Sequence, residues 1–163
     1  ALRHSPTDLI LYPLARRGER FPFIAPEATG FALGQTDDEE VLFAAHLEGL
    51  AYVERLSFQV LAELGAEVGE TIYVAGGGTQ SAAGLQIRAD VLHKCLRVPQ
   101  VPLGAMGAAI LAARGHVFPS LGEAARQMVR FRQAVEPRPG QLAAYEERYE
   151  RFLEACRARG YLS

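Results

Sequence analysis

The pattern of hydrophobic and polar positions predicts four short strands. Residues 9–14 (LILYPL) and 30–35 (GFALGQ) are apolar, extended runs, the first interrupted by a proline. Residues 71–75 (TIYVA) form the clearest strand, because they are β-branched or aromatic and are flanked by glycines. A further short strand is expected over 96–98, where two nearby prolines end it.

Helices are predicted between and after these strands. The residues TDDE at 36–39 match a capping box, with the threonine hydroxyl accepting from the glutamate N–H, so we expect a helix over 37–64 that stops at Gly65. Its apolar residues spread widely around the cylinder, which predicts burial on much of the circumference. Further helices are expected over 81–92 and over 104–114, the latter with an unusually small face.

Beyond Gly115 the pattern is helical only. The residues SLGE at 120–123 match a second capping box, which predicts a helix that continues to about Phe131. A turn follows at PRPG, and the last helix is expected over about 141–159. Its apolar stripe has spacings of four, three and four residues, made up of Tyr145, Tyr149, Phe152 and Cys156.

The order of these elements predicts the fold class. Strand, helix, strand and helix alternate over 71–114, which is typical of parallel strands joined by right-handed crossovers. We therefore expect an α/β fold with a parallel βαβ part and flanking helices. A chain of 163 residues has the length of one domain, so residues 1–163 are expected to form a single domain.

Composition narrows the class of protein. Apolar residues make up 49% and charged residues 22%, as in an ordinary globular domain. The net charge of −2 gives no excess of basic residues of the kind that binds nucleic acid. No run approaches the roughly 20 apolar residues of a membrane-spanning helix, and the first residues lack the apolar core of a signal peptide. Two cysteines, Cys95 and Cys156, are too few for a disulfide framework, which favours the cytoplasm. Because the chain starts at Ala1, we expect a piece of a longer protein.

The most informative motif is the run of three glycines, Gly76–Gly78, directly after the strand at 71–75. One interpretation is a tight turn that needs positive φ and holds no ligand. The other is a bare backbone that touches a flat or anionic ligand at the carboxyl end of a parallel strand, beside the N–H groups of the next helix. The second is favoured, because a turn rarely needs three glycines.

Two known phosphate motifs fit this segment poorly. A dinucleotide fingerprint G-x-G-x-x-G would need glycine where Ser81 stands, and an acidic strand end about 20 residues further on. A Walker loop would need Gly-Lys-Ser or Gly-Lys-Thr, which does not follow. Among nearby polar residues, Asp90 is either a metal ligand or, as we favour, a brace between helix and loop. From the residues alone, the prediction is therefore a nucleotide or phosphate site.

Four segments in a fixed order resemble the C-terminal domain of the FGGY carbohydrate kinases, which include xylulose, ribulose, gluconate and glycerol kinases. The resemblance covers about residues 9–160. The segments are Pro13–Pro22 (PLARRGERFP), Glu48–Tyr52 (EGLAY), Gly76–Asp90 (GGGTQSAAGLQIRAD) and Val98–Ala113 (VPQVPLGAMGAAILAA).

This resemblance implies an actin-like ATPase fold with two ribonuclease-H-like lobes, of which this chain would be the C-terminal, nucleotide-binding lobe. The implied lobe is α/β, a mixed sheet with a parallel βαβ part and flanking helices. The N-terminal, sugar-binding lobe would be absent from the chain, and with it the catalytic aspartate and most sugar contacts. No catalytic residue and no metal ligand are expected in this chain. The implied nucleotide-binding residues are Gly76, Gly77, Gly78, Thr79, Gln80 and Ser81. Glycerol kinases often carry a nucleotide-binding asparagine at the position that matches Ala82.

The implied function is ATP binding in a kinase that transfers the γ-phosphoryl group to a sugar or polyol hydroxyl. The implied ligands are ATP or ADP with Mg²⁺, and the implied partners are the N-terminal lobe and the sugar or polyol in the cleft between lobes. A homodimer is compatible with the sequence. Two alternatives stay open: a non-catalytic ligand-binding or assembly module of the same fold, and a dinucleotide-binding oxidoreductase domain.

Overall fold

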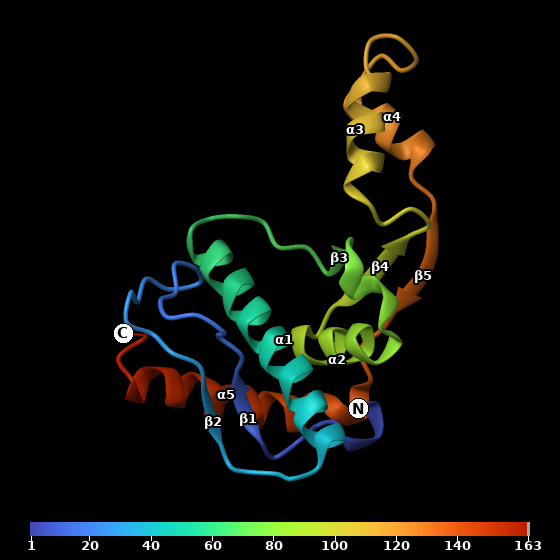
Figure 1. Ribbon diagram of the computed structural model, residues 1–163. Helices are drawn as coiled ribbons and strands as arrows, with labels where there is room; N and C mark the ends of the chain where they lie inside the picture. The colour runs from blue at the N-terminus through green and yellow to red at the C-terminus, as the bar shows by residue number, and fades with distance from the viewer. Residues whose placement is uncertain (163) are drawn as a thin grey trace.

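Two packed parts and a projecting arm make up the computed structural model, which describes residues 1–162 (Figure 1). The helices are η1 (Leu2–His4), α1 (Glu39–Glu63), η2 (Gly77–Gln80), α2 (Ala82–Leu92), α3 (Gly104–Ala113), α4 (Leu121–Met128), η3 (Pro139–Gln141) and α5 (Leu142–Ala158). The strands are β1 (Ile10–Tyr12), β2 (Phe31–Leu33), β3 (Thr71–Tyr73), β4 (Cys95–Pro99) and β5 (Phe131–Val135).

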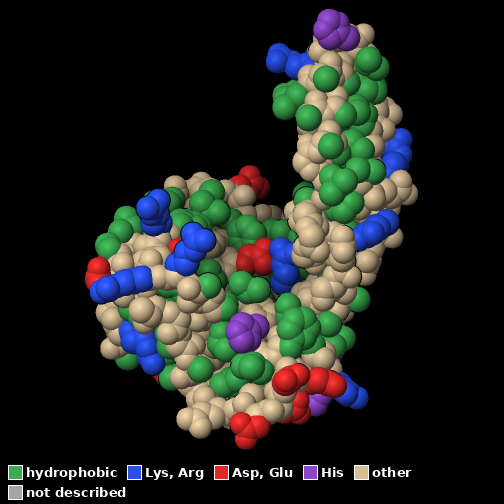
Figure 2. All heavy atoms as spheres, viewed as in Figure 1, with side chains coloured by type: hydrophobic (Ala, Val, Ile, Leu, Met, Phe, Trp, Pro, Cys, Tyr) green, Lys and Arg blue, Asp and Glu red, His purple; other side chains and the backbone are tan. Residues whose placement is uncertain are grey.

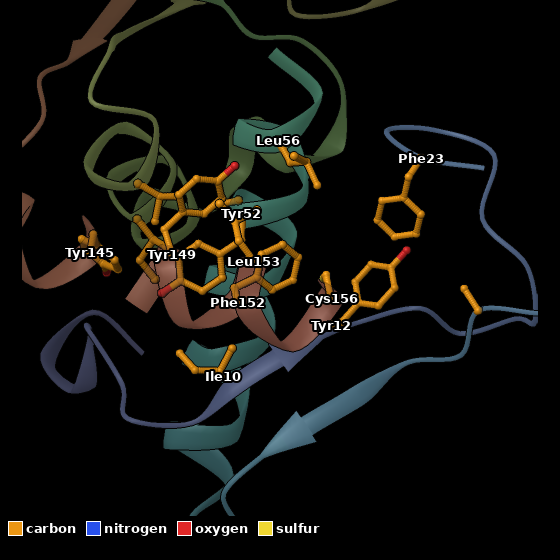
Figure 3. Close-up of a cluster of buried hydrophobic side chains, with 14 residues drawn as sticks. Ile10, Tyr12, Phe23, Tyr52, Leu56, Tyr145, Tyr149, Phe152, Leu153 and Cys156 are labelled. Atoms are coloured by element: carbon orange, nitrogen blue, oxygen red, sulfur yellow. The ribbon is translucent and has the colours of Figure 1, made fainter. Parts of the chain in front are cut away.

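The first part is built around α1, which packs against α2 and β1, while α5 packs on α2 and β1. β1 and β2 form an antiparallel pair in which Ile10 lies opposite Leu33. Aromatic side chains from three of these elements fill the core, and Figure 3 shows them converging. The core also includes the predicted stripe of α5, whose four members are fully buried: Tyr145, Tyr149, Phe152 and Cys156.

The second part is a three-stranded sheet in the order β3–β4–β5. β3 and β4 run parallel, with Thr71 opposite Cys95, and α2 connects them, so the predicted βαβ unit is confirmed. β5 pairs antiparallel with β4, which makes the sheet mixed. A cluster of buried residues packs α2 onto one face of this sheet: Val74, Leu85, Ala89, Leu92, Leu96, Val98 and Val135.

The arm consists of α3 and α4, which pack on each other and project from the end of the sheet (Figure 1). α3 was expected from its apolar sequence, yet it buries no residue. Leu103 and Leu111 are 60% and 64% exposed, and Figure 2 shows apolar side chains along the arm. A helix of this composition normally lies in a core, and an exposed apolar surface of this kind is typical of interaction sites.

The structure corrects the expectation that only helices follow Gly115. α4 ends at Met128, short of the predicted Phe131, and residues 131–135 form the strand β5. The free side of β4 explains the difference: backbone groups there gain hydrogen bonds from an extended neighbour, and this tertiary pairing outweighs local helix propensity. The predicted cap of this helix is confirmed, because Ser120 Oγ accepts from the N–H of Glu123 at 3.2 Å.

Two expectations about α1 were also wrong. Its N-cap is Asp38, whose Oδ1 accepts from the N–H of Glu40 at 2.8 Å, and not Thr36, whose hydroxyl accepts from Asp38 N–H instead. One face of the helix is exposed rather than buried, with Phe43 and Leu50 at 55% and 57%. The predicted stop is confirmed by Gly65, which follows the helix with φ +89°.

Candidate functional site

A turn of glycines follows β3 at the carboxyl end of the strand, where open α/β sheets bind their ligands. Gly76 has φ +84° and ψ −171°, a backbone conformation that residues with a Cβ rarely adopt. Its N–H donates to the carbonyl of Pro102 at 2.7 Å, which ties the turn to the segment after β4. The fold itself therefore accounts for the glycine at position 76.

Gly77 and Gly78 have no such explanation within the described residues. Neither has a positive φ, and a Cβ built on either one would meet no atom within 4 Å. Gly49 differs, since a Cβ there would lie 2.2 Å from the backbone oxygen of Leu11, a packing contact inside the chain. The two turn glycines thus leave open space beside bare backbone, which is the arrangement that a ligand lying against the main chain requires.

Thr79 holds the turn closed from inside. It is only 3% exposed, and its hydroxyl and its N–H both donate to the carbonyl of Gly76, at 2.8 Å and 3.2 Å. Its own carbonyl accepts from Arg132 of β5 at 3.0 Å. The side chain of Thr79 therefore stabilises the shape of the turn.

Ser81 begins the helix that follows the glycines. Its Oγ accepts from the N–H of Gly84 at 3.0 Å, which makes it the N-cap of α2. The neighbouring Gln80 is exposed at the surface of the turn. The structure thus brings all six predicted residues into one continuous turn and helix start, with Gln80 and the backbone of Gly77 and Gly78 on the outside.

An open cavity of about 500 Å³ lies beside this turn. Thr79, Gln80 and Ala82 line it from the turn and the start of α2, while Arg132 and Gln133 line it from β5. The sequence did not predict the two β5 residues, because the helix was expected to continue to about Phe131 and no strand was expected after it. The signal that could have found them is the short run FRQAV, whose aromatic and β-branched ends suit a strand.

Asp90, the other polar candidate, is a structural brace, as the favoured interpretation predicted. It is fully buried near the end of α2. Its Oδ1 accepts from the backbone N–H of Arg138 at 2.7 Å and from Gln86 Nε2 at 3.0 Å, and its Oδ2 accepts from Arg138 Nε at 2.8 Å. These bonds hold the chain after β5 against α2 and occupy the carboxylate.

Two further findings concern residues 1–162 as a whole. No group of three or more histidine, cysteine, aspartate or glutamate side chains is placed to hold a metal ion there. Within the same residues, no helix combines the length and the apolar character that crossing a membrane requires.

Comparison with known proteins gives the family. The model of the FGGY family of carbohydrate kinases, C-terminal domain, matches residues 2–116. The autoinducer-2 kinase of Salmonella paratyphi A is 32% identical over 117 residues, which are 71% of this chain and 22% of that protein. The structure of ligand-bound xylulose kinase from Lactobacillus acidophilus has a TM-score of 0.80 and 22% identity, covering 92% of this chain and 31% of that chain.

The structure of Plasmodium falciparum glycerol kinase with ADP also has this fold, with a TM-score of 0.69 and 20% identity over 90% of this chain and 30% of that chain. These superpositions confirm the expected α/β, actin-like ATPase fold class. The chain spans only about a fifth of the curated relative, 22% of its length, and less than a third of the two solved chains.

Proposed function

Because the chain belongs to the FGGY family of carbohydrate kinases, whose C-terminal domain it matches, we propose that it holds the adenine nucleotide of an ATP-dependent kinase. The parent enzyme transfers the γ-phosphoryl group of ATP to a hydroxyl of a sugar or polyol. Phosphoryl transfer depends on positioning and charge neutralisation, so the contribution of this domain is to hold the nucleotide in place. The free cysteines Cys95 and Cys156 agree with the reducing cytoplasm as its compartment.

The observation that carries this proposal is the open space at Gly77 and Gly78. At these two positions, neither the backbone conformation nor the packing inside the described chain requires a glycine. A nucleotide lying flush on the turn would fill the space that a Cβ otherwise takes. The residues that would hold it are Gly76–Gly78 by their backbone, with Gln80 and Ser81 at the rim. Bound ATP supplies the transferable phosphoryl group, together with its Mg²⁺.

The partner in this proposal is the remainder of the same kinase polypeptide, including its N-terminal, sugar-binding lobe. Two exposed surfaces support it. β3 is an edge strand of a sheet with parallel pairing, and its Tyr73 is 65% exposed, whereas parallel sheets are normally covered. The apolar helix α3 has no buried residue, and its Leu111 is exposed to solvent. The general base that accepts the proton of the sugar hydroxyl would lie in that other lobe.

The test is ADP binding, measured by calorimetry on the complete kinase polypeptide with Gly78→Val and with a matched control. Gly140 serves as the control because it also lies in a short helix, η3, with no positive φ and no atom within 4 Å of a built Cβ. Gly78→Val is expected to weaken ADP binding at least about tenfold, because the new side chain would enter the space of the nucleotide. Gly140→Val should leave the affinity unchanged.

The same titrations separate the alternatives. Equal ADP affinity in wild type, Gly78→Val and Gly140→Val would contradict the assignment of the site. Absence of adenine-nucleotide binding by the complete wild-type protein would favour a non-catalytic module, and binding of NADH without ATP would favour a dinucleotide-dependent oxidoreductase.

A further inference from the structure

β5 carries one extra residue beside the end of β4. Val98 of β4 lies opposite Gln133, and the next residue, Pro99, lies opposite Phe131, so Arg132 has no partner position on β4. An extra residue of this kind is a β-bulge, which bends the strand and redirects a side chain, and bulges are frequent next to functional sites. In this chain the redirected side chain is an arginine.

The bulge allows Arg132 to reach the glycine turn. Its Nη2 donates to the carbonyl of Thr79 at 3.0 Å, and the hydroxyl of Thr79 in turn donates to the carbonyl of Gly76 at 2.8 Å. The preceding residue, Phe131, lies elsewhere, with its ring 5.4 Å from that of Tyr73 and under the guanidinium of Arg97. Two successive hydrogen bonds therefore connect β5 to the first glycine of the turn.

We propose that Arg132 is a positioning residue of the nucleotide site. By holding the carbonyl of buried Thr79, it fixes the turn that presents Gly77 and Gly78, and it keeps a positive charge in the cavity lined by Gln80 and Ala82. The inference rests on the proposed function of this turn. It adds a residue outside the segment 2–116 that the family model matches, on a strand that the sequence did not predict.

Arginine suits this role for a physical reason. A charged donor makes a stronger hydrogen bond to a carbonyl than a neutral one, and the planar guanidinium keeps further N–H groups free beside the acceptor. Arg132 acts through Thr79 and the backbone, so its loss should weaken the binding of substrate and of transition state equally. The expected signature is a higher KM for ATP with little change in kcat.

The experiment compares three variants of the complete kinase polypeptide in ADP titrations and in steady-state assays with varied ATP. Arg132→Met keeps the length of the stem but removes the donor, and it is expected to raise the Kd for ADP and the KM for ATP about tenfold, with kcat within about twofold. Arg132→Lys keeps one charged donor and should recover most of that loss. Arg97→Met removes a neighbouring arginine that lies over Phe131, and it should leave both constants unchanged.

Each outcome decides the inference. Unchanged Kd in Arg132→Met, or equal changes in Arg132→Met and Arg97→Met, would overturn it while leaving the nucleotide site itself intact. A kcat that falls while Kd and KM stay constant would also overturn it, since the residue would then act in the chemical step. If wild type binds no ADP, the proposed function fails first, and the inference fails with it.

Discussion

The buried carboxylate of Glu48 accepts a hydrogen bond of 2.7 Å from the hydroxyl of Thr7, which joins α1 to the segment before β1. The backbone N–H of Thr7 donates to Oε1 of the same carboxylate at 3.0 Å, and the hydroxyl of Tyr145 on α5 donates to it at 3.3 Å. Glu48 is fully buried. One side chain of the EGLAY segment thus links α1, the segment before β1 and α5.

This relationship predicts a pH-dependent stability. Burial raises the pKa of Glu48 above its ordinary value, against the opposing effect of hydrogen bonds from Thr7. A raised pKa in the folded state means that folding favours the protonated form, so this contribution to stability is complete below the unfolded pKa of about 4.5. It is lost as the pH rises through the higher, folded pKa.

The measurement is the difference in melting temperature between Glu48→Gln and wild type across that pH window. Because the glutamine cannot ionise, the melting temperature of Glu48→Gln should rise relative to that of wild type as the pH rises. A difference that stays constant from pH 4 to pH 8 would show that burial does not disfavour the ionised carboxylate.

A second prediction contrasts two glycines of unlike surroundings. A Cβ at Gly49 would lie 2.2 Å from the backbone oxygen of Leu11, so Gly49→Ala is expected to lower the free energy of unfolding by about 3 kcal/mol. A Cβ at Gly77 meets nothing within 4 Å, so Gly77→Ala should change the free energy of unfolding by less than about 0.5 kcal/mol. Urea denaturation measures both. Comparable losses at the two positions would mean that the fold itself requires Gly77.

A third prediction concerns two ion pairs of equal length and opposite exposure. Arg138 and Asp90 are 2.7 Å apart with the carboxylate side chain fully buried, while Arg148 and Asp8 are 2.7 Å apart with the carboxylate side chain 91% exposed. Asp90→Ala should cost about 3–5 kcal/mol of unfolding free energy, because it strands a partly buried charge and a backbone N–H. Asp8→Ala should cost less than about 1 kcal/mol. Similar values for the two variants would contradict the role of Asp90 as a brace.

A fourth prediction concerns the 163-residue chain on its own. We expect it to bind ADP or ATP weakly and to phosphorylate no sugar, since the proposed general base lies in the other lobe. A coupled assay for ADP release in the presence of candidate sugars and polyols tests this. Sugar-dependent turnover by the isolated chain would show that the base lies within residues 1–163.

The parts of the fold that depend on local signals were predictable from the sequence. The strand TIYVA, the glycines after it and Ser81 as the start of α2 occur in one continuous segment, so the βαβ unit could be read directly. The stripe of α5 was equally clear, because Tyr149 and Phe152 repeat at helical spacing. The resemblance of four segments to one family then placed the candidate site on the turn.

The features that the sequence did not predict depend on contacts between residues that are far apart in the chain. β5 exists because β4 offers an edge, and no glycine or proline between Met128 and Phe131 marks the end of α4. Arg132 could not be assigned to the site, since its direction follows from a bulge that only strand pairing creates. The exposed face of α1 was predicted to be buried. An apolar pattern shows that a helix face needs a packing partner, but it does not show whether the chain itself contains that partner.

The most direct measurement is a crystal structure of the complete kinase polypeptide with ADP. It is predicted to place the nucleotide against the backbone of Gly77 and Gly78, with atoms of the adenosine or its phosphates in the space where a Cβ at either position would lie. Nucleotide density in another crevice, or side chains of the protein filling the space beside these two glycines, would contradict the account.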